Sequence, residues 1–264
     1  MSEIEQRKLE EMAFHDQLRA VHLQDTERYA YYTSNKKFYS VVRQSVAHVE
    51  SLLQRECRGK RILDFGCGDG RYSLELARDA ASVTGVDISP ESIRICREAA
   101  EKAGVADKVT FEVSDCEALP VPDESFDVVL DMGVLHHMDV SRAFAEMSRV
   151  LKAGGVAICA EALAHNPFIQ MYRRRTPHLR THWEMHHILG ARQIESARRY
   201  FGQIDYTFFH LAVLAAVPFQ NTLLFKPLLT VLEHVDAVIL RTPGLKWWAW
   251  QVVFELRKPL RRVP

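Results

Sequence analysis

The chain has 264 residues, of which 47% are hydrophobic and 26% charged, proportions that exclude a disordered or fibrous protein. Its length is sufficient for one large domain with a full apolar core. Thirty-four basic residues balance thirty-four acidic ones, so the net charge gives no reason to expect binding to nucleic acid.

The first 56 residues contain neither glycine nor proline, which favours two helices, at about residues 3–28 and 35–56. Aromatic side chains gather between these two helices. Among them, Tyr29 and Tyr32 are candidates for closing over a bound substrate.

From residue 61, short β-branched or apolar segments alternate with helical ones. The expected strands are residues 61–65, 82–87, 109–113, 126–130 and 156–161, and the expected helices are residues 71–79, 90–103 and 140–151. This alternation predicts right-handed βαβ units, and therefore a doubly wound α/β domain with a parallel sheet and helices on both faces.

After Glu161 the alternation ends. The expected elements are an insertion over one end of the sheet (162–190), a helix (190–201), a strand (204–210), an apolar and mostly helical stretch (211–246) and a last strand (250–256). The chain is therefore expected to contain an N-terminal helical lid (1–56), a core (57–161) and a cap that includes the last strands (162–264).

A glycine-rich segment, Asp64-Phe65-Gly66-Cys67-Gly68-Asp69-Gly70, follows the first expected strand. Glycine permits a tight turn and close approach of a ligand to the backbone, and the N–H groups of the helix that follows favour an anionic group. By itself, this segment is also explained by a tight strand-to-helix turn.

Two carboxylates strengthen the cofactor interpretation. Asp87 ends the second expected strand and Asp115 follows the third. Doubly wound folds bind ligands at the carboxyl ends of the strands, where a carboxylate accepts hydrogen bonds from ribose hydroxyls. The glycine spacing is G-x-G-x-G, whereas NAD enzymes carry G-x-G-x-x-G, so a NAD dehydrogenase is disfavoured.

With the later motifs included, residues from about 60 to 161 resemble the class I S-adenosylmethionine-dependent methyltransferases, particularly the small-molecule group that includes the ubiquinone and menaquinone methylases. The matching segments follow the family's order: Asp64 to Gly70, Val86-Asp87-Ile88-Ser89, Ser114 to Pro120, Phe126-Asp127-Val128-Val129, Leu135-His136-His137 and Leu151 to Gly155. The resemblance implies a Rossmann-like, seven-stranded, mostly parallel sheet of order 3-2-1-4-5-7-6. It also implies S-adenosyl-L-methionine as cofactor and S-adenosyl-L-homocysteine as product.

The resemblance further implies which residues contact the cofactor. The implied contacts are Asp64 with the methionine amino group, Gly66, Cys67 and Gly68 with the methionine chain, Asp87 with the ribose hydroxyls, Ile88, Asp115 and Cys116 with adenine, and Met132 and Gly133 with the surroundings of the sulfonium.

Methyl transfer from a sulfonium is an in-line displacement, so alignment is the enzyme's main task. A base is required only when the acceptor must lose a proton, and histidine is the natural candidate. We expect this base to be His137 or His165, which follow the fourth and fifth strands, with Glu161 as an orienting carboxylate. Alternatively, His136-His137 belongs only to the family's loop signature and contacts cofactor or backbone.

The same histidines raise the question of a metal. His182 and His186, like Glu161 and His165, are four residues apart and would share one face of a helix. A zinc site usually needs three or four converging ligands. The sequence shows no tight cluster of ligands, so we expect no metal.

The insertion is rich in arginine, with seven between residues 165 and 199. Arg173-Arg174-Arg175 beside Tyr172 could bind a carboxylate or phosphate of the substrate, because guanidinium donors match these anions in pairs. Tyr172, Arg173 and His186 are therefore candidate substrate contacts. An exposed basic surface would give the same pattern.

The tail departs from the family, whose last two strands are commonly joined by a short hairpin. Residues 211–232 are strongly apolar, but Pro218 and Pro227 and the polar residues near them make membrane spanning costly. One interpretation is a cap that forms a pocket for a hydrophobic substrate. Another is peripheral contact of residues 211–262 with a bilayer, in which Trp247, Trp248 and Trp250 lie beside basic side chains. A further helical layer or a dimer interface also fits.

We therefore expect a methyltransferase that acts on an oxygen or carbon of a small hydrophobic metabolite, quinone-, polyketide- or lipid-like. Two alternatives are non-methyl transfer or cyclisation with the same cofactor, and a catalytically silent scaffold bound to a membrane or partner. Five scattered cysteines and the absence of a secretory signal at the start favour the cytoplasm, with peripheral contact at the inner membrane surface.

Overall fold

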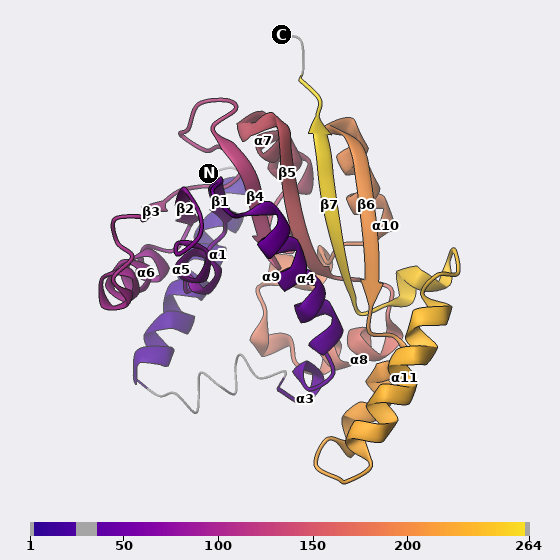
Figure 1. The fold of residues 1–264 in the computed structure, drawn as a ribbon. Helices are drawn as coiled ribbons and strands as arrows, with labels where there is room; N and C mark the ends of the chain where they lie inside the picture. Colours follow the sequence, from indigo (N-terminus) through magenta and orange to yellow (C-terminus); the bar gives the residue numbers. More distant parts are fainter. Residues whose placement is uncertain (1–2, 25–35, 262–264) are drawn as a thin grey trace.

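Seven strands form one sheet of order β3-β2-β1-β4-β5-β7-β6 in the computed structural model, which describes residues 3–24 and 36–261. Strands β1 to β5 run parallel, and β7 is antiparallel to both of its neighbours (Figure 1). The strands are β1 (Arg61–Phe65), β2 (Ser82–Asp87), β3 (Val109–Val113), β4 (Phe126–Met132), β5 (Leu151–Ala162), β6 (Phe201–Phe209) and β7 (Gln251–Pro259). The predicted sheet and its order are confirmed.

The helices surround this sheet and include short 3-10 turns, labelled η. They are α1 (Glu3–Gln24), α3 (Lys36–Tyr39), α4 (Arg43–Glu56), α5 (Arg71–Leu76), α6 (Pro90–Ala103), η1 (Leu135–His137), α7 (Val140–Val150), α8 (Pro167–Arg175), η2 (Pro177–Leu179), α9 (His182–His186), α10 (Ala191–Glu195), η3 (Ser196–Arg199), η4 (Ala212–Phe219), α11 (Phe225–Ile239) and η5 (Leu245–Trp248). The helix expected at 35–56 is divided into α3 and α4 by a turn. Tyr29 and Tyr32 lie outside the described residues.

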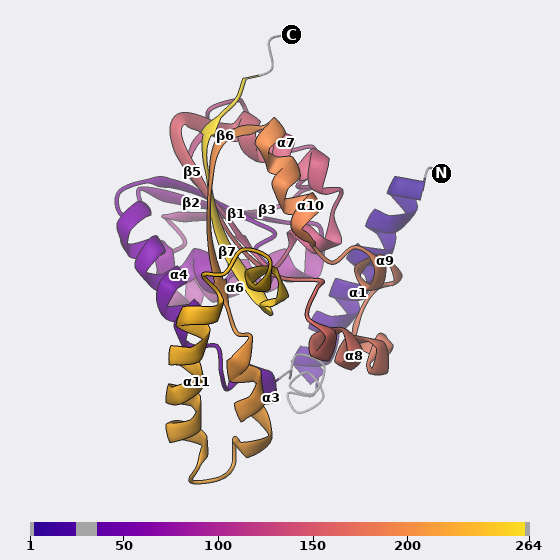
Figure 2. The ribbon, with the colours of Figure 1, turned by 90° about the vertical axis from the view of Figure 1, so that its right-hand side faces the viewer.

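The two faces of the sheet bury separate apolar clusters, because alternate residues of a strand point to opposite faces. Ile62 packs with α4, α5 and α6, whereas the next residue, Leu63, packs with α7 and α10. Figure 2 shows the sheet edge-on, with α4 and α6 on one side and α7 and α10 on the other. The layers are those of a doubly wound domain, with helices on both faces.

The connection from β6 to β7 is a helical hairpin made of η4 and α11. It packs on α3 and α8 through a third apolar cluster, which includes Val41, Ile169, Val217, Leu229 and Trp250. In Figure 1, α11 extends beyond the end of β6 and β7. Among residues 3–24 and 36–261, no helix combines the length and the apolar content that crossing a membrane requires.

Candidate active site

A cleft of about 540 Å³ opens at the carboxyl ends of the first strands. Ten of its lining residues are those that the resemblance assigns to the cofactor: Asp64, Gly66, Cys67, Gly68, Asp87, Ile88, Asp115, Cys116, Met132 and Gly133. They come from four strand ends, so the fold gathers in one place residues that span seventy positions of the sequence. Their individual contacts with a cofactor stay predictions.

The glycine-rich turn after β1 has the backbone that its sequence predicts. Gly66 has a φ of 78°, and a Cβ added there would lie 2.4 Å from Val134 Cγ1, so a larger residue would force the turn away from the loop after β4. The amide of Gly68 donates to Asp87 Oδ2 at 2.9 Å. Asp87 Oδ1 in turn accepts from the Ser89 amide at 2.9 Å. These bonds fix the turn and the Asp87 carboxylate relative to each other.

Of the two carboxyl groups at the base of the cleft, Asp64 is buried and Asp87 is partly buried. Ser73 Oγ donates to Asp64 Oδ2 at 2.6 Å, yet burial raises the pKa of Asp64 to about 6. Burial also raises the pKa of Asp87, although backbone hydrogen bonds oppose it. A cationic ligand group would stabilise the ionised form of both, so the base of the cleft suits a ligand that carries a positive charge.

Helix α1, part of the expected N-terminal lid, supplies a second wall of the cleft, although the sequence analysis did not identify its lining residues. Four cleft-lining residues recur at every fourth position of this helix and share one face: Arg7, Glu11, His15 and Arg19. Lys8 joins them, with its Nζ 2.5 Å from Asp115 Oδ2. Charged residues are rarely buried unless they are paired, so buried Arg7 and Glu11 mark α1 as part of the site. The four-residue spacing of ionisable groups was the available signal.

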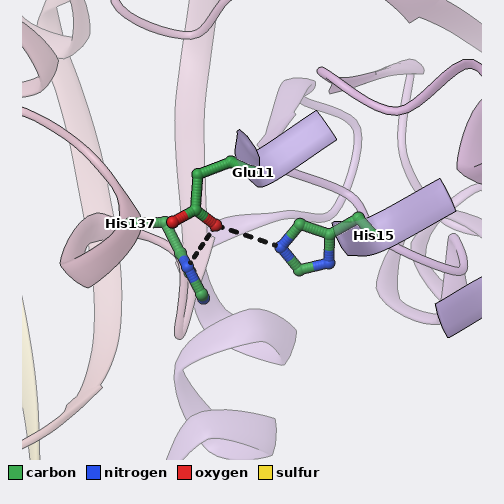
Figure 3. A group of neighbouring side chains, drawn as sticks. All are labelled: Glu11, His15 and His137. Carbon is green, nitrogen blue, oxygen red and sulfur yellow. Dashed lines mark hydrogen bonds and ion pairs between the residues drawn. The ribbon is translucent and has the colours of Figure 1, made fainter. Parts of the chain in front are cut away.

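Glu11, His15 and His137 meet at the wall of the cleft (Figure 3). Glu11 Oε2 lies 2.9 Å from His137 Nδ1 and 3.7 Å from His15 Nε2, while Glu11 Oε1 accepts a hydrogen bond from Thr181 Oγ1. Burial opposes ionisation of Glu11, but the bonds from His137 and Thr181 outweigh it and lower the pKa of Glu11. A carboxylate only accepts, so Nδ1 of His137 carries a hydrogen in this contact, which leaves Nε2 as the ring nitrogen that can accept a proton.

Burial and the neighbouring His137 lower the pKa of His15 to about 3. The His15 imidazole is therefore neutral at physiological pH. It cannot supply positive charge to the Glu11 carboxylate, which leaves His137 as the principal partner of Glu11.

Glu161 pairs with His136 and not with His137. Its Oε2 lies 2.8 Å from His136 Nδ1, and its Oε1 accepts from the Leu135 amide at 2.7 Å. Burial raises the pKa of Glu161 to about 7, and burial together with the Glu161 charge raises the pKa of adjacent Asp131 well above its usual range. Glu161 does not line the cleft. Its hydrogen bonds to Leu135 and His136 fix the position of η1.

The remaining predicted residues lie away from the lining of the cleft. His165 is exposed, and its Nε2 accepts from the Ala191 amide at 3.3 Å. Arg173 Nη2 bonds Glu184 Oε1 at 2.8 Å, which leaves this guanidinium less available to an anion. The ring of Tyr172 lies 5.0 Å from that of Phe38, and exposed His186 contacts the His182 carbonyl at 3.0 Å. Their substrate and catalytic roles stay predictions.

Two groups of side chains could hold a metal ion among the described residues. One is Glu11, His15 and His137, and the other is His136, His137 and Glu184, with ligating atoms within 4.8 Å of one another in each group. Two imidazoles and one carboxylate are ligands that zinc or iron accepts. The sequence analysis found no such cluster because α1 and η1 are more than a hundred residues apart.

Comparison with known proteins agrees with this geometry. Residues 63–159 match the family model described as a methyltransferase domain. The chain is 42% identical over 99 residues to the 27-O-demethylrifamycin SV methyltransferase of Amycolatopsis mediterranei, covering 37% of this chain and 36% of that protein. It is 37% identical over 111 residues to a ubiquinone/menaquinone biosynthesis C-methyltransferase of Geobacter sulfurreducens, covering 40% and 43%. The chain thus spans less than half of the length of these relatives.

Solved structures support the same fold over more of the chain. The geranyl diphosphate C-methyltransferase of Streptomyces coelicolor, solved with Mg²⁺, geranyl diphosphate and S-adenosyl-L-homocysteine, aligns with a TM-score of 0.58 at 16% identity, covering 81% of this chain and 80% of that one. The [4+2]-cyclase SpnF aligns with a TM-score of 0.55 at 24% identity, covering 83% of each chain. Residues 63–159 therefore resemble a methyltransferase domain, and the seven-stranded sheet around them has the fold of these solved structures.

Proposed function

We propose that the protein transfers a methyl group from S-adenosyl-L-methionine to an oxygen or carbon of a small hydrophobic metabolite and releases S-adenosyl-L-homocysteine. The observation that carries this proposal is the cleft at the carboxyl ends of the first strands. It combines all ten cofactor residues expected from the family with a histidine–carboxylate pair on its wall.

The cleft fits the cofactor in size and chemistry. About 540 Å³ lies within the range of small-molecule sites, roughly 300–1,000 Å³. The cationic amino group of the methionine moiety would stabilise the ionised form of Asp64, and the ribose hydroxyls would donate to Asp87. Asp115 would exchange the Lys8 ammonium for the adenine amino group. The cofactor supplies an electrophilic methyl group on a sulfonium.

His137 is the residue best placed to act as the base. With Nδ1 held by Glu11, its Nε2 would take the proton that the acceptor loses as it bonds to the methyl carbon. The Glu11 carboxylate would stabilise the imidazolium formed in this step. His165 is the weaker candidate because it is exposed and lies outside the lining of the cleft.

A hydrophobic acceptor is supported by the apolar part of the cleft. Tyr39, Tyr72 and Met138 line it beside Met132, and aromatic and thioether groups pack well against planar rings. The relatives include a 27-O-demethylrifamycin SV methyltransferase and a ubiquinone/menaquinone biosynthesis C-methyltransferase, which agrees with a quinone- or polyketide-like acceptor. We place the protein in the cytoplasm with peripheral contact at a membrane, as developed below.

Asp87→Ala tests the cofactor assignment. Calorimetry with S-adenosyl-L-methionine and S-adenosyl-L-homocysteine should show binding to the wild type and a loss of at least about tenfold in the variant, because two charge-assisted hydrogen bonds disappear. Unchanged affinity in a folded Asp87→Ala variant would refute the assignment.

Two alternatives give different results with an acceptor. A product without the added mass of one methyl group would indicate cyclisation or another transfer, the type of chemistry named for the structural neighbour SpnF. Cofactor binding without turnover of any lipophilic phenol or quinol would favour a scaffold.

A further inference from the structure

The hairpin between β6 and β7 presents apolar side chains to solvent. Leu223 is 98% exposed, Leu224 62%, Val231 61% and Val238 69%, and half-exposed Val235 lies between the last two. We call these five residues the outer face of the hairpin. From Leu224 to Val238 the intervals are seven, four and three residues, which place the side chains on one side of α11. Contiguous exposed apolar surface of this kind marks an interaction site.

The exposed face is rigidly placed. On the inner side of α11, Leu229 packs in the third apolar cluster with Val217 and Trp250. Asp236 accepts hydrogen bonds from the amides of Leu211 at 3.1 Å and Ala212 at 2.6 Å. Because α11 is held from within, its outer face is a fixed feature of the surface.

The charged side chains that the hairpin exposes are all cationic. Between residues 206 and 254 the only acidic residues are Glu233 and Asp236. Both are buried: Glu233 pairs with Arg43, with Oε1 2.6 Å from its Nε, and Asp236 faces the backbone. The exposed charges are therefore cationic and include Lys226 and Arg241. An exposed apolar helix face with a cation near each end of the helix fits a helix that lies on an anionic bilayer.

A second copy of the chain would suit this surface less well. Neither hairpin exposes an acid that could pair with Lys226 or Arg241 of a second copy. Helical dimers usually flank an apolar seam with opposite charges. The charge pattern therefore favours lipid over self-association.

The position of the hairpin relates it to the cleft. Because β7 is antiparallel to both β5 and β6, β6 runs parallel to β5 and ends at the carboxyl edge of the sheet. The hairpin leaves from this edge, where the cleft also opens. Figures 1 and 2 both show η4 and α11 projecting beyond that edge.

We propose that the outer face of the hairpin docks on an anionic membrane surface and brings the open end of the cleft to the bilayer. The argument for docking uses the structure of the hairpin alone. The purpose of docking, delivery of a lipophilic acceptor, rests on the proposed function. The proposed membrane contact involves fewer residues than the predicted range 211–262. Trp250 is buried, the Trp247 ring packs on Phe208 at 4.9 Å, and only Trp248 remains half exposed at the base of the hairpin.

The test is co-sedimentation of the full chain with vesicles of phosphatidylcholine, with and without phosphatidylglycerol. The wild type should sediment with the anionic vesicles. Val231→Asp should weaken binding by roughly tenfold or more. The double change Lys226→Glu and Arg241→Glu should weaken it by at least about thirtyfold at low salt, because each lost cation removes about one kcal/mol of attraction.

Val113→Asp is the matched control, since Val113 is 50% exposed on β3 at the opposite edge of the sheet. It should bind vesicles like the wild type. Absence of wild-type binding, or equal loss in Val113→Asp and Val231→Asp, would overturn the proposal. A dimer in light scattering that Val231→Asp abolishes would identify a second copy as the occupant instead.

Cofactor calorimetry separates this proposal from the function. Val231→Asp should bind S-adenosyl-L-methionine normally, whereas Asp87→Ala should lose the cofactor and still sediment with vesicles. Failure of either proposal would therefore leave the other standing.

Discussion

Replacing Glu11 by Gln should lower turnover without weakening cofactor binding. The substitution keeps the shape and an acceptor oxygen but removes the charge that faces His137 Nδ1 at 2.9 Å. A hydrogen bond to a charged group contributes about 1.5–3 kcal/mol and a neutral one about 1 kcal/mol. The imidazolium formed during proton transfer would therefore lose about 0.5–2 kcal/mol of stabilisation. At 1.36 kcal/mol per factor of ten, kcat should fall about 2- to 30-fold.

The assay is steady-state kinetics with the acceptor that a screen of lipophilic phenols and quinols identifies. A positioning role for Glu11 predicts a fall in kcat with little change in KM for either substrate. Glu10→Gln is the matched control, because exposed Glu10 lies on the same helix and accepts a hydrogen bond from Gln6 Nε2 at 3.2 Å. Its kinetics should equal those of the wild type.

Two results would refute the reasoning. Unchanged kcat in Glu11→Gln would show that His137 needs no carboxylate or is not the base. Equal losses in cofactor affinity and in kcat would show that Glu11 only anchors α1 over the cleft, a structural role.

Two further predictions concern metal and pH. Dialysis against a chelator should leave kcat unchanged, because a His137–Glu11 pair needs no ion; a loss that zinc or cobalt restores would instead identify Glu11, His15 and His137 as a metal site. Burial raises the pKa of Glu161 from 4.5 to about 7, so the folded state binds more protons than the unfolded chain between these values. The stability that this protonation contributes is present at low pH and is lost as the pH rises through about 7. Glu161→Gln should therefore flatten the decline in melting temperature between about pH 5 and pH 7, and an unchanged slope would argue that Glu161 ionises normally.

The sheet was predictable because its information is local. Each core strand carries its own apolar pattern, and β2, α6 and β3 begin and end where the sequence predicts. The cofactor residues were predictable for the same reason: they follow strand ends directly, and parallel strands bring those ends to one edge. Asp64, Asp87 and Asp115 line one cleft although they are far apart in the sequence.

The partners of the histidines were not predictable, because they depend on how distant elements pack. His136 and His137 are adjacent in sequence, yet His136 pairs with Glu161 of β5 and His137 with Glu11 of α1. The spacing of residues along the chain does not indicate which carboxylate each histidine contacts. Glu161, expected to orient the base, contacts His136 instead of either candidate base, and its orienting role stays a prediction.

Two helices depart from the usual rule of burial, and in opposite senses. Helix α1 buries Arg7 and Glu11, whereas α11 exposes Leu224 and Val231. Each departure costs stability if nothing compensates for it, because buried charge needs a partner and exposed apolar surface stays hydrated. Both occur at the carboxyl edge of the sheet, where the cleft opens. Such departures are expected where positions serve binding and not folding, which links the wall of the cleft and the hairpin to one function.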